Sequence, residues 1–405
     1  MKKQLLLIGM SLIICSGSLY AQGDNTGYGG NENNDYESLA HRIFNLEKKN
    51  DMFNVYFNYS YSFQEGRDAD KQWGSHFANK QLRLEIKGNL TDHLYYRFRH
   101  RLNKSVSAQS EDNFAKATDI MMAGYRFNPK ISVEAGKMCQ IWGGFEFDEN
   151  PMYIYQYSDM VDYMDNFMAG VVVNYNPVPT QTFSAEISDA NNGKFSDEYG
   201  TDARTVGRSL ADISPLTKAK NPLTYILNWS GSFFGDKFQT KWSWGIQTQA
   251  QHKYSRMIVL GEKLNLPTLQ WYFDYMGAFD GLDRLKIASS ELAGYLNSNE
   301  PNTFFSDVHY NSLISKVNWQ FAPQWNFMAK GTYETASVEH IDNLRNYRKS
   351  IGYIGSIEYY PVKKQDLRIF LAYVGHNYNF SHKCDLQNYN TSRIELGFMY
   401  RIKAF

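Results

Sequence analysis

Three arginines occupy alternate positions in one short stretch of this 405-residue chain, at Arg97, Arg99 and Arg101. Because side chains of a β-strand alternate between its two faces, an extended chain would place all three on one face, at intervals of about 7 Å. Arg83 and Lys87 share a face of the preceding segment in the same way. Burying these cations in lipid would cost several kcal/mol, so the face they share must be wet.

Two interpretations of this strip of cations remain open. Fixed charges on the wall of a water-filled passage attract ions of opposite sign, so the strip can steer anions. The alternative is a generic water-lined wall whose charge is partly neutralised by Glu85.

The segment 140–166 contains no lysine or arginine and carries six carboxylates. They are Glu146, Asp148, Glu149, Asp159, Asp162 and Asp165. Clustered carboxylates suit Ca²⁺, but the last three have helical spacing and lack the loop pattern of an EF-hand. The alternatives are a solvated loop and an acidic surface that faces the arginines. That last arrangement would create a transverse field favouring polar solutes of no single charge sign.

A two-residue hydrophobic period extends over the segments that carry these residues. Between Phe53 and Phe63, apolar side chains alternate with asparagine and serine over about twelve residues. Strands of soluble proteins usually have about 5–6 residues, whereas strands that cross a membrane at a tilt need about 9–11. The pattern predicts strands at 52–63, 76–88, 93–103, 117–127, 131–139, 167–175, 181–188, 222–232, 238–251, 267–276, 283–289, 309–320, 324–333, 350–360, 367–377 and 391–403.

The connections between these strands alternate between short and long. The short ones contain turn residues, such as Asn128-Pro129-Lys130 and Gly235-Asp236. The long ones are 64–75, 104–116, 140–166, 189–221, 252–266, 290–308, 334–349 and 378–390. This alternation predicts an all-β protein: a transmembrane, antiparallel, up-and-down β-barrel of about 16 strands over 51–405, with short periplasmic turns and long extracellular loops.

Composition and the N-terminal residues indicate the compartment. Aromatic residues make up 16% of the chain although mean hydropathy is −0.52, and no run of 18 apolar residues could form a membrane helix. Residues 1–21 read as a signal peptide, with Lys2 and Lys3 before an apolar run and Ala21 at the cleavage site. Cys15 leaves a lipoprotein as the alternative. Residues 22–50 are predicted to be a periplasmic, partly disordered segment, and the barrel is expected among outer-membrane lipids.

Motifs for other chemistry are missing from the sequence. A net charge of zero gives no indication of nucleic-acid binding. The nine histidines form no HExxH pair, and neither a GxSxG elbow nor a P-loop occurs, so no cofactor, metal or enzymatic activity is predicted. Cys139 and Cys384 both fall on the predicted extracellular side, where they could pair.

A family resemblance rests on Gly136–Val173, GKMCQIWGGFEFDENPMYIYQYSDMVDYMDNFMAGVVV, together with FNVYFNYSYSF near the start. These stretches resemble porins of the Bacteroidota related to the phosphate-selective porin O and P family. The resemblance implies a sixteen-stranded barrel, often a homotrimer, whose third extracellular loop folds inward. That loop would be 140–166, entered through Trp142, Gly143 and Gly144. Phosphate-selective members bind the anion with arginine and lysine at the constriction, and 140–166 departs from this pattern by having neither.

These features together predict passive diffusion of small hydrophilic solutes or ions. Loop 140–166 would filter by size, and the cations from Arg83 to Arg101 would filter by charge in favour of anions. Two alternatives remain. One is a structural or surface-binding barrel plugged by 22–50 or 189–221. The other is an outer-membrane enzyme, but His100 is expected on the lipid face and Ser243 on the lumen face, which is poor geometry for catalysis.

Overall fold

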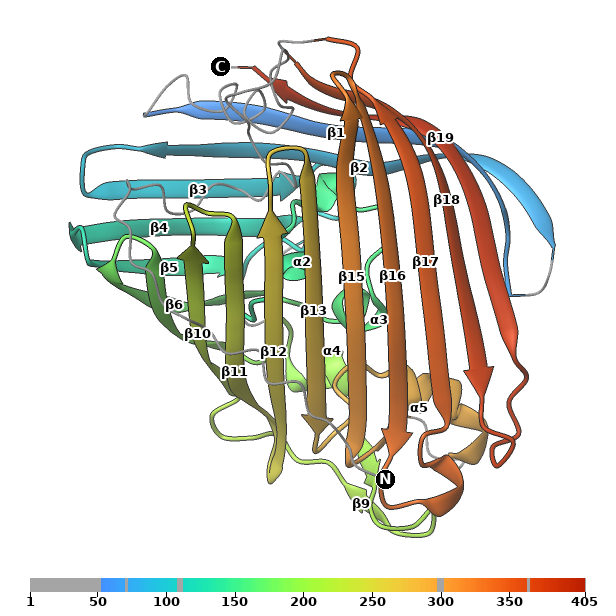
Figure 1. Cartoon of the computed structure of the whole chain (residues 1–405). Coiled ribbons are helices and arrows are strands. Elements are labelled where there is room, and N and C mark those ends of the chain that lie inside the picture. Colours follow the sequence, from blue (N-terminus) through green and yellow to red (C-terminus); the bar gives the residue numbers. More distant parts are fainter. Residues whose placement is uncertain (1–51, 70–71, 108–111, 297–301, 363–364, 405) are drawn as a thin grey trace, which may run out of the picture.

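The computed structural model describes residues 52–69, 72–107, 112–296, 302–362 and 365–404, and the predicted signal peptide and periplasmic segment lie outside these residues. Sixteen antiparallel strands form one closed barrel (Figure 1). They are β1 (Asn54–Arg67), β2 (Trp73–Asn89), β3 (Leu94–Arg101), β4 (Thr118–Asn128), β5 (Ile131–Cys139), β6 (Phe167–Val178), β7 (Gln181–Asp189), β10 (Leu223–Phe233), β11 (Phe238–Ala250), β12 (Lys253–Asn265), β13 (Leu269–Asp280), β15 (Val308–Ala322), β16 (Trp325–Val338), β17 (Arg348–Tyr359), β18 (Asp366–Phe380) and β19 (Tyr389–Lys403). Each pairs with the next along the chain, and β19 closes on β1 with Tyr56 opposite Lys403.

The alternation predicted for the first strand is present in β1. Asn58, Ser60 and Ser62 are buried on the inner face, whereas Phe63 on the outer face is 39% exposed. The outer face carries aromatic contacts between neighbouring strands, such as Tyr59 against Phe398 at 5.3 Å between ring centroids. Apolar and aromatic side chains on the outside and polar ones inside are the arrangement that a lipid-embedded barrel requires.

Short turns lie at one end of the barrel, and six of the eight connections at the other end are longer, the two exceptions being 68–72 and 251–252. The short turns, at the left and top of Figure 1, are 90–93, 129–130, 179–180, 234–237, 266–268, 323–324 and 360–365. We number the connections at the opposite end as loops 1–8, at 68–72, 102–117, 140–166, 190–222, 251–252, 281–307, 339–347 and 381–388. The predicted sixteen-stranded up-and-down barrel is therefore confirmed.

Three predicted segments are wrong. Segment 64–75, expected to be a long loop, is mostly strand, because β1 extends to Arg67 and β2 begins at Trp73. The other two errors offset each other in the strand count. Segment 252–266, expected to be a long loop, forms strand β12 after a two-residue turn. Met257 and Val259 of β12 point inward and are fully buried, so this strand is apolar on both faces and lacks a two-residue period. Segment 283–289, expected to be a strand, lies in loop 6. Its alternation comes from Leu285 and Ile287, which pack into a core within the loops.

Loops 4 and 6 pair with each other outside the barrel. Strands β8 (Arg204–Val206) and β9 (Ile213–Pro215) of loop 4 form a three-stranded sheet with β14 (Thr303–Phe305) of loop 6. Short helices accompany them: α4 (Phe195–Tyr199), α5 (Ile287–Glu291) and η2 (Ala293–Tyr295), with η3 (Asp342–Leu344) in loop 7. Phe305, Leu292 and Leu344 are fully buried in one apolar cluster, so loops 4, 6 and 7 form a packed cap over part of the mouth. None of the described helices is long and apolar enough to cross a membrane.

Candidate pore constriction

Loop 3 folds into the barrel instead of extending from it, and its short helices α2 (Phe145–Asp148) and α3 (Asp159–Asp162) lie inside the wall (Figure 1). A third short helix, η1 (Pro151–Tyr153), lies between them. Loop 3 turns into the barrel at Gly143 and Gly144, whose φ angles of 74° and 75° lie in a region that residues with a Cβ rarely adopt. Directly after them, both oxygens of Asp274 in β13 accept the Phe145 backbone N–H, at 3.0 and 2.8 Å, and one also accepts that of Glu146 at 2.8 Å. A wall carboxylate therefore caps the first turn of the loop.

Apolar packing holds the same loop against the wall at β10, β12, β13 and β15. One cluster joins loop and wall, to which the loop contributes Trp142, Phe145, Phe147, Met160, Val161 and Met164, and the wall Ile226, Met257, Val259, Tyr272, Met276 and Ile314. Each fully buried aliphatic or aromatic side chain contributes roughly 1.5–3 kcal/mol. Trp142 is 1% exposed and donates its indole N–H to Gln140 at 3.0 Å. It is thus part of this core.

Four of the six loop carboxylates form ion pairs with cations on the wall. Glu146 pairs with Lys330, Glu149 with Lys316, Asp148 with Lys241, and Asp159 with Arg348 at 2.6 Å. These cations come from β11, β15, β16 and β17, at sequence separations of 93–189 residues. The two remaining carboxylates are Asp165, which accepts a hydrogen bond from Asn192 at 2.7 Å, and Asp162, which is exposed at the end of α3. The loop's acidity is therefore largely neutralised where it meets the wall.

The predicted basic strip lies inside the barrel, on β2 and β3. Arg83, Arg99 and Arg101 converge on a single carboxylate, Asp119 at the start of β4, at 3.3, 3.3 and 2.6 Å. Their guanidinium groups outnumber that carboxylate three to one.

The remaining two cations of the strip lie nearer the short turns. Arg97 pairs with Glu85 at 2.8 Å, and Arg401 of β19 shares this carboxylate at 3.4 Å. Lys87 lies 5.6 Å from the ring centre of Tyr56.

Two further cations beside the strip were not predicted from the sequence. Lys80 in β2 and Arg393 in β19 share Glu395, at 2.6 and 2.5 Å. Both also donate to the Tyr155 carbonyl oxygen of loop 3, at 3.1 and 3.0 Å. The alternation on β19 indicated an inward Arg393, but nothing in the sequence indicated that loop 3 would reach it.

Side-chain exposure shows which inward charges meet water. Arg97, Arg101 and Arg393 are 29%, 22% and 28% exposed although they point inward, whereas Arg83 and Arg99 are 5% exposed. Asp148 is 37% exposed. The first three therefore line the space that water can enter.

The two cysteines do not pair. Both Cys139 and Cys384 are free, and Cys384 of loop 8 is buried against the cap, where its thiol lies 3.0 Å from the Ser381 carbonyl oxygen.

Comparison with known proteins places the chain among porins. The model of the family "Phosphate-selective porin O and P" matches residues 53–402. No curated protein sequence matches. The outer-membrane channel DcaP of Acinetobacter baumannii is 9% identical with a TM-score of 0.58, covering 87% of this chain and 98% of that one.

Two further solved structures have the same fold. The anion-selective porin from Comamonas acidovorans is 8% identical with a TM-score of 0.54, covering 86% of this chain and 99% of that one. OmpT of Vibrio cholerae is 9% identical with a TM-score of 0.53, covering 86% and 97%. Fold and family both point to a channel and not to an enzyme. The chain belongs to the phosphate-selective porin O and P family and forms an outer-membrane channel for small solutes.

Proposed function

We propose that this channel passes small hydrophilic solutes by passive diffusion and favours anions, and that the charge filter is the basic arc of the wall. The basic arc consists of the inward cations of β2, β3 and β19: Lys80, Arg83, Lys87, Arg97, Arg99, Arg101, Arg393, Arg401 and Lys403. Among the residues that the structure describes, Asp119, Glu85 and Glu395 form ion pairs with members of this arc. Around Asp119 alone, Arg83, Arg99 and Arg101 place three positive charges against one negative charge, which leaves a local excess of positive charge.

The acidic loop does not cancel this excess. Its buried carboxylates Glu146, Glu149 and Asp159 each pair with a cation of the opposite wall, outside the basic arc. The partly exposed Asp148 is likewise paired, with Lys241. The potential in the water-filled space is therefore set mainly by the arc, because a charge with a close counter-ion acts only weakly at a distance.

Water-exposed guanidinium groups would attract anions without holding them tightly. Arg97 and Arg101 remain in contact with solvent, so an anion can exchange water for a guanidinium contact at low cost. Weak binding of an anion at successive guanidinium groups allows the anion both to enter the channel and to leave it. We propose selectivity for small anions as a class, and the family's phosphate preference would be one case within it.

Reversal potentials in planar bilayers under a salt gradient test this proposal. The wild-type channel should give a potential of anion sign, and R97Q/R101Q should move it toward the cation side. K349Q is the matched control, because Lys349 lies in β17 on the outer, exposed side, so its loss changes the net charge without changing the lumen. The arc would be excluded as the filter if R97Q/R101Q behaved like K349Q. A correctly inserted protein without conductance would favour a plugged barrel.

Three finer features are also proposed. The chain would assemble as a homotrimer, the form in which one structure of OmpT of Vibrio cholerae was solved. Residues 1–21 would be removed on export, and the source would be a member of the Bacteroidota. Light scattering in detergent and N-terminal sequencing of the mature protein test the first two, and a monomer or an intact Met1 would refute them.

A further inference from the structure

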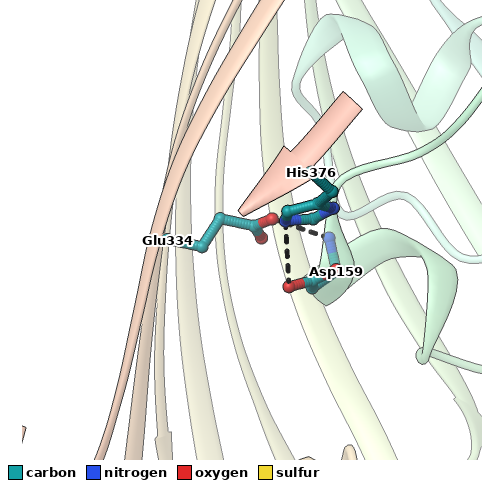
Figure 2. A group of neighbouring side chains, drawn as sticks. All are labelled: Asp159, Glu334 and His376. Carbon is teal, nitrogen blue, oxygen red and sulfur yellow. Dashed lines mark hydrogen bonds and ion pairs between the residues drawn. The ribbon is translucent and has the colours of Figure 1, made fainter. Parts of the chain in front are cut away.

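Three side chains with metal-ligating atoms meet where loop 3 touches the wall. Asp159 belongs to α3 of the loop, Glu334 to β16 and His376 to β18. Each offers one ligand atom, and these atoms lie within 4.8 Å of one another. Figure 2 shows the Glu334 carboxylate and the imidazole pointing toward each other, with the Asp159 carboxylate beside the ring. The three residues are only 5%, 2% and 2% exposed.

The imidazole is oriented as a ligand would be. Nδ1 of His376 lies 3.1 Å from the Tyr378 hydroxyl, and the two rings stack at 4.2 Å between centroids. Nε2 is buried without a hydrogen-bond partner in the described part of the chain, and lies 3.8 Å from Oδ2 of Asp159. Metal-bound histidines typically use their second nitrogen for a hydrogen bond that fixes the ring, which is the arrangement here.

The surroundings carry an excess of negative charge. Within the described residues Glu334 has no cationic partner. Its oxygens accept the backbone N–H groups of Asp159 and Met160, at 2.9 and 3.3 Å, and the Ser312 hydroxyl. Four carboxylates gather in this network, namely Asp159, Glu334, Glu146 and Glu291, against two cations, Lys330 and Arg348. The carboxylates outnumber the cations four to two, and a cation bound among them would stabilise their ionised forms in a buried site.

Arg348 and Ser350 bond the Asp159 oxygen that faces the imidazole. Nη2 of Arg348 bonds Oδ2 of Asp159 at 2.6 Å, and the Ser350 hydroxyl bonds the same oxygen at 3.0 Å. A metal ion would therefore share Oδ2 with these two donors or bind through Oδ1. Arg348 also pairs with Glu291 at 2.8 Å, so its charge is shared between two carboxylates.

We propose that Asp159, Glu334 and His376 bind one divalent transition-metal ion of the Zn²⁺ type, with water completing the coordination. One imidazole and two carboxylates are a ligand set for such ions, whereas Ca²⁺ takes oxygen ligands only. Ligands about 2.1 Å from zinc lie roughly 3.4 Å apart, so the side chains must close around the ion. One double charge would match the excess. The bound ion would fasten loop 3 to β16 and β18, and this binding does not depend on the proposed ion selectivity.

Zinc titration of the full-length protein tests the site. The protein is stripped with EDTA, folded in detergent and titrated with ZnCl₂ by calorimetry. We expect one saturable site per chain, affinity lowered at least tenfold by H376Q and E334Q, and no comparable heat with CaCl₂. H340Q is the control, because His340 is 44% exposed in loop 7 and lies outside the site. Co²⁺ in place of zinc should give visible absorption bands in wild type that H376Q loses.

Several outcomes would overturn the proposal. They are the absence of saturable one-to-one binding in wild type, equal affinities of wild type and H376Q, and equal binding of Ca²⁺ and Zn²⁺. Circular dichroism and the heat-dependent gel shift of a folded barrel identify any variant that fails to fold. In that case E334D, which keeps a carboxylate, takes its place and should retain weaker binding that requires His376.

Discussion

Replacing Lys330 by methionine should release loop 3 locally while leaving the barrel closed. The Lys330 and Glu146 side chains are 3% and 0% exposed, and Lys330 also donates to the Gln156 carbonyl oxygen at 2.7 Å. Methionine fills similar space but leaves Glu146 buried without its cation. Removing one partner of a buried pair costs about 3–5 kcal/mol, which corresponds to roughly two to four orders of magnitude in the equilibrium constant for local opening.

Hydrogen exchange followed by mass spectrometry measures this opening, because loop amides exchange through local unfolding. The informative peptides cover 145–160, where wall carboxylates accept the backbone N–H groups of Phe145, Glu146 and Asp159. Exchange there should accelerate by about two orders of magnitude or more in K330M, up to the limit set by the loop's own stability. Peptides from β1 and β19 should not change.

A comparison within the same loop makes the prediction refutable. Lys241 pairs with Asp148, but these side chains are 23% and 37% exposed, and exposed pairs contribute only about 0–1 kcal/mol. K241M should therefore accelerate exchange by less than about tenfold. The double variant K330M/E146Q should recover most of the lost protection, since it removes the stranded charge. Equal effects of K330M and K241M would refute the reasoning that burial determines the strength of these pairs.

Two further predictions concern loop stability. Gly144 has φ of 75° and ψ of 162°, a region essentially limited to glycine, and a Cβ there would lie 3.1 Å from Val259 Cγ1. G144A should therefore destabilise loop 3 by about 1–3 kcal/mol. Urea unfolding followed by tryptophan fluorescence measures this loss, and an unchanged unfolding midpoint would contradict the prediction. Burial raises the pKa of Asp283 in loop 6, although hydrogen bonds from Tyr310 and Ser289 oppose this shift. Folding therefore disfavours the ionised carboxylate. The free energy of unfolding should fall as the pH rises from the pKa of Asp283 in the unfolded chain through its pKa in the folded protein. Thermal melts of D283N across that window should show a smaller slope with pH than wild type, and an equal or steeper slope would contradict the assignment.

The architecture could be predicted because lipid imposes a repetitive pattern on strands. Every strand that is apolar outside and polar inside, such as β1, is visible as a two-residue period. Strand β12 is the exception. Its inner face carries the apolar residues Met257 and Val259 because loop 3 covers them, so both faces of the strand are apolar there and the two-residue period is lost. In loop 6, Lys286 at φ of 59° breaks the extended chain that the alternation of Leu285 and Ile287 had indicated.

The pairing of charges could not be predicted. Lys316 and Lys330 were visible as polar positions on their strands, but their partners in loop 3 lie 167 and 184 residues away. Nothing in a single sequence selects among the inward lysines of several strands. Asp119 is similar, because its contact with three arginines depends on an irregularity in the pairing of β3 with β4, between Arg99 and His100.

The apolar inner surface of β12 and β13 has a mechanical consequence. A barrel wall whose inner face is polar stays well hydrated when an inward-folded loop is removed. Here, removal of loop 3 would expose the apolar side chains of Met257, Val259 and Met276 to water in the lumen. The barrel is therefore double-layered with apolar packing along β10–β15, whereas at β2 and β19 loop 3 is attached through polar contacts, such as those of Lys80 and Arg393 with the Tyr155 carbonyl oxygen. A swinging gate would have to separate a hydrophobic core each time it opened. Any change in pore width should instead come from small displacements at the side where loop 3 is held by polar contacts and where the cations lie. Shortening the loop should produce an unstable barrel and not a wider pore.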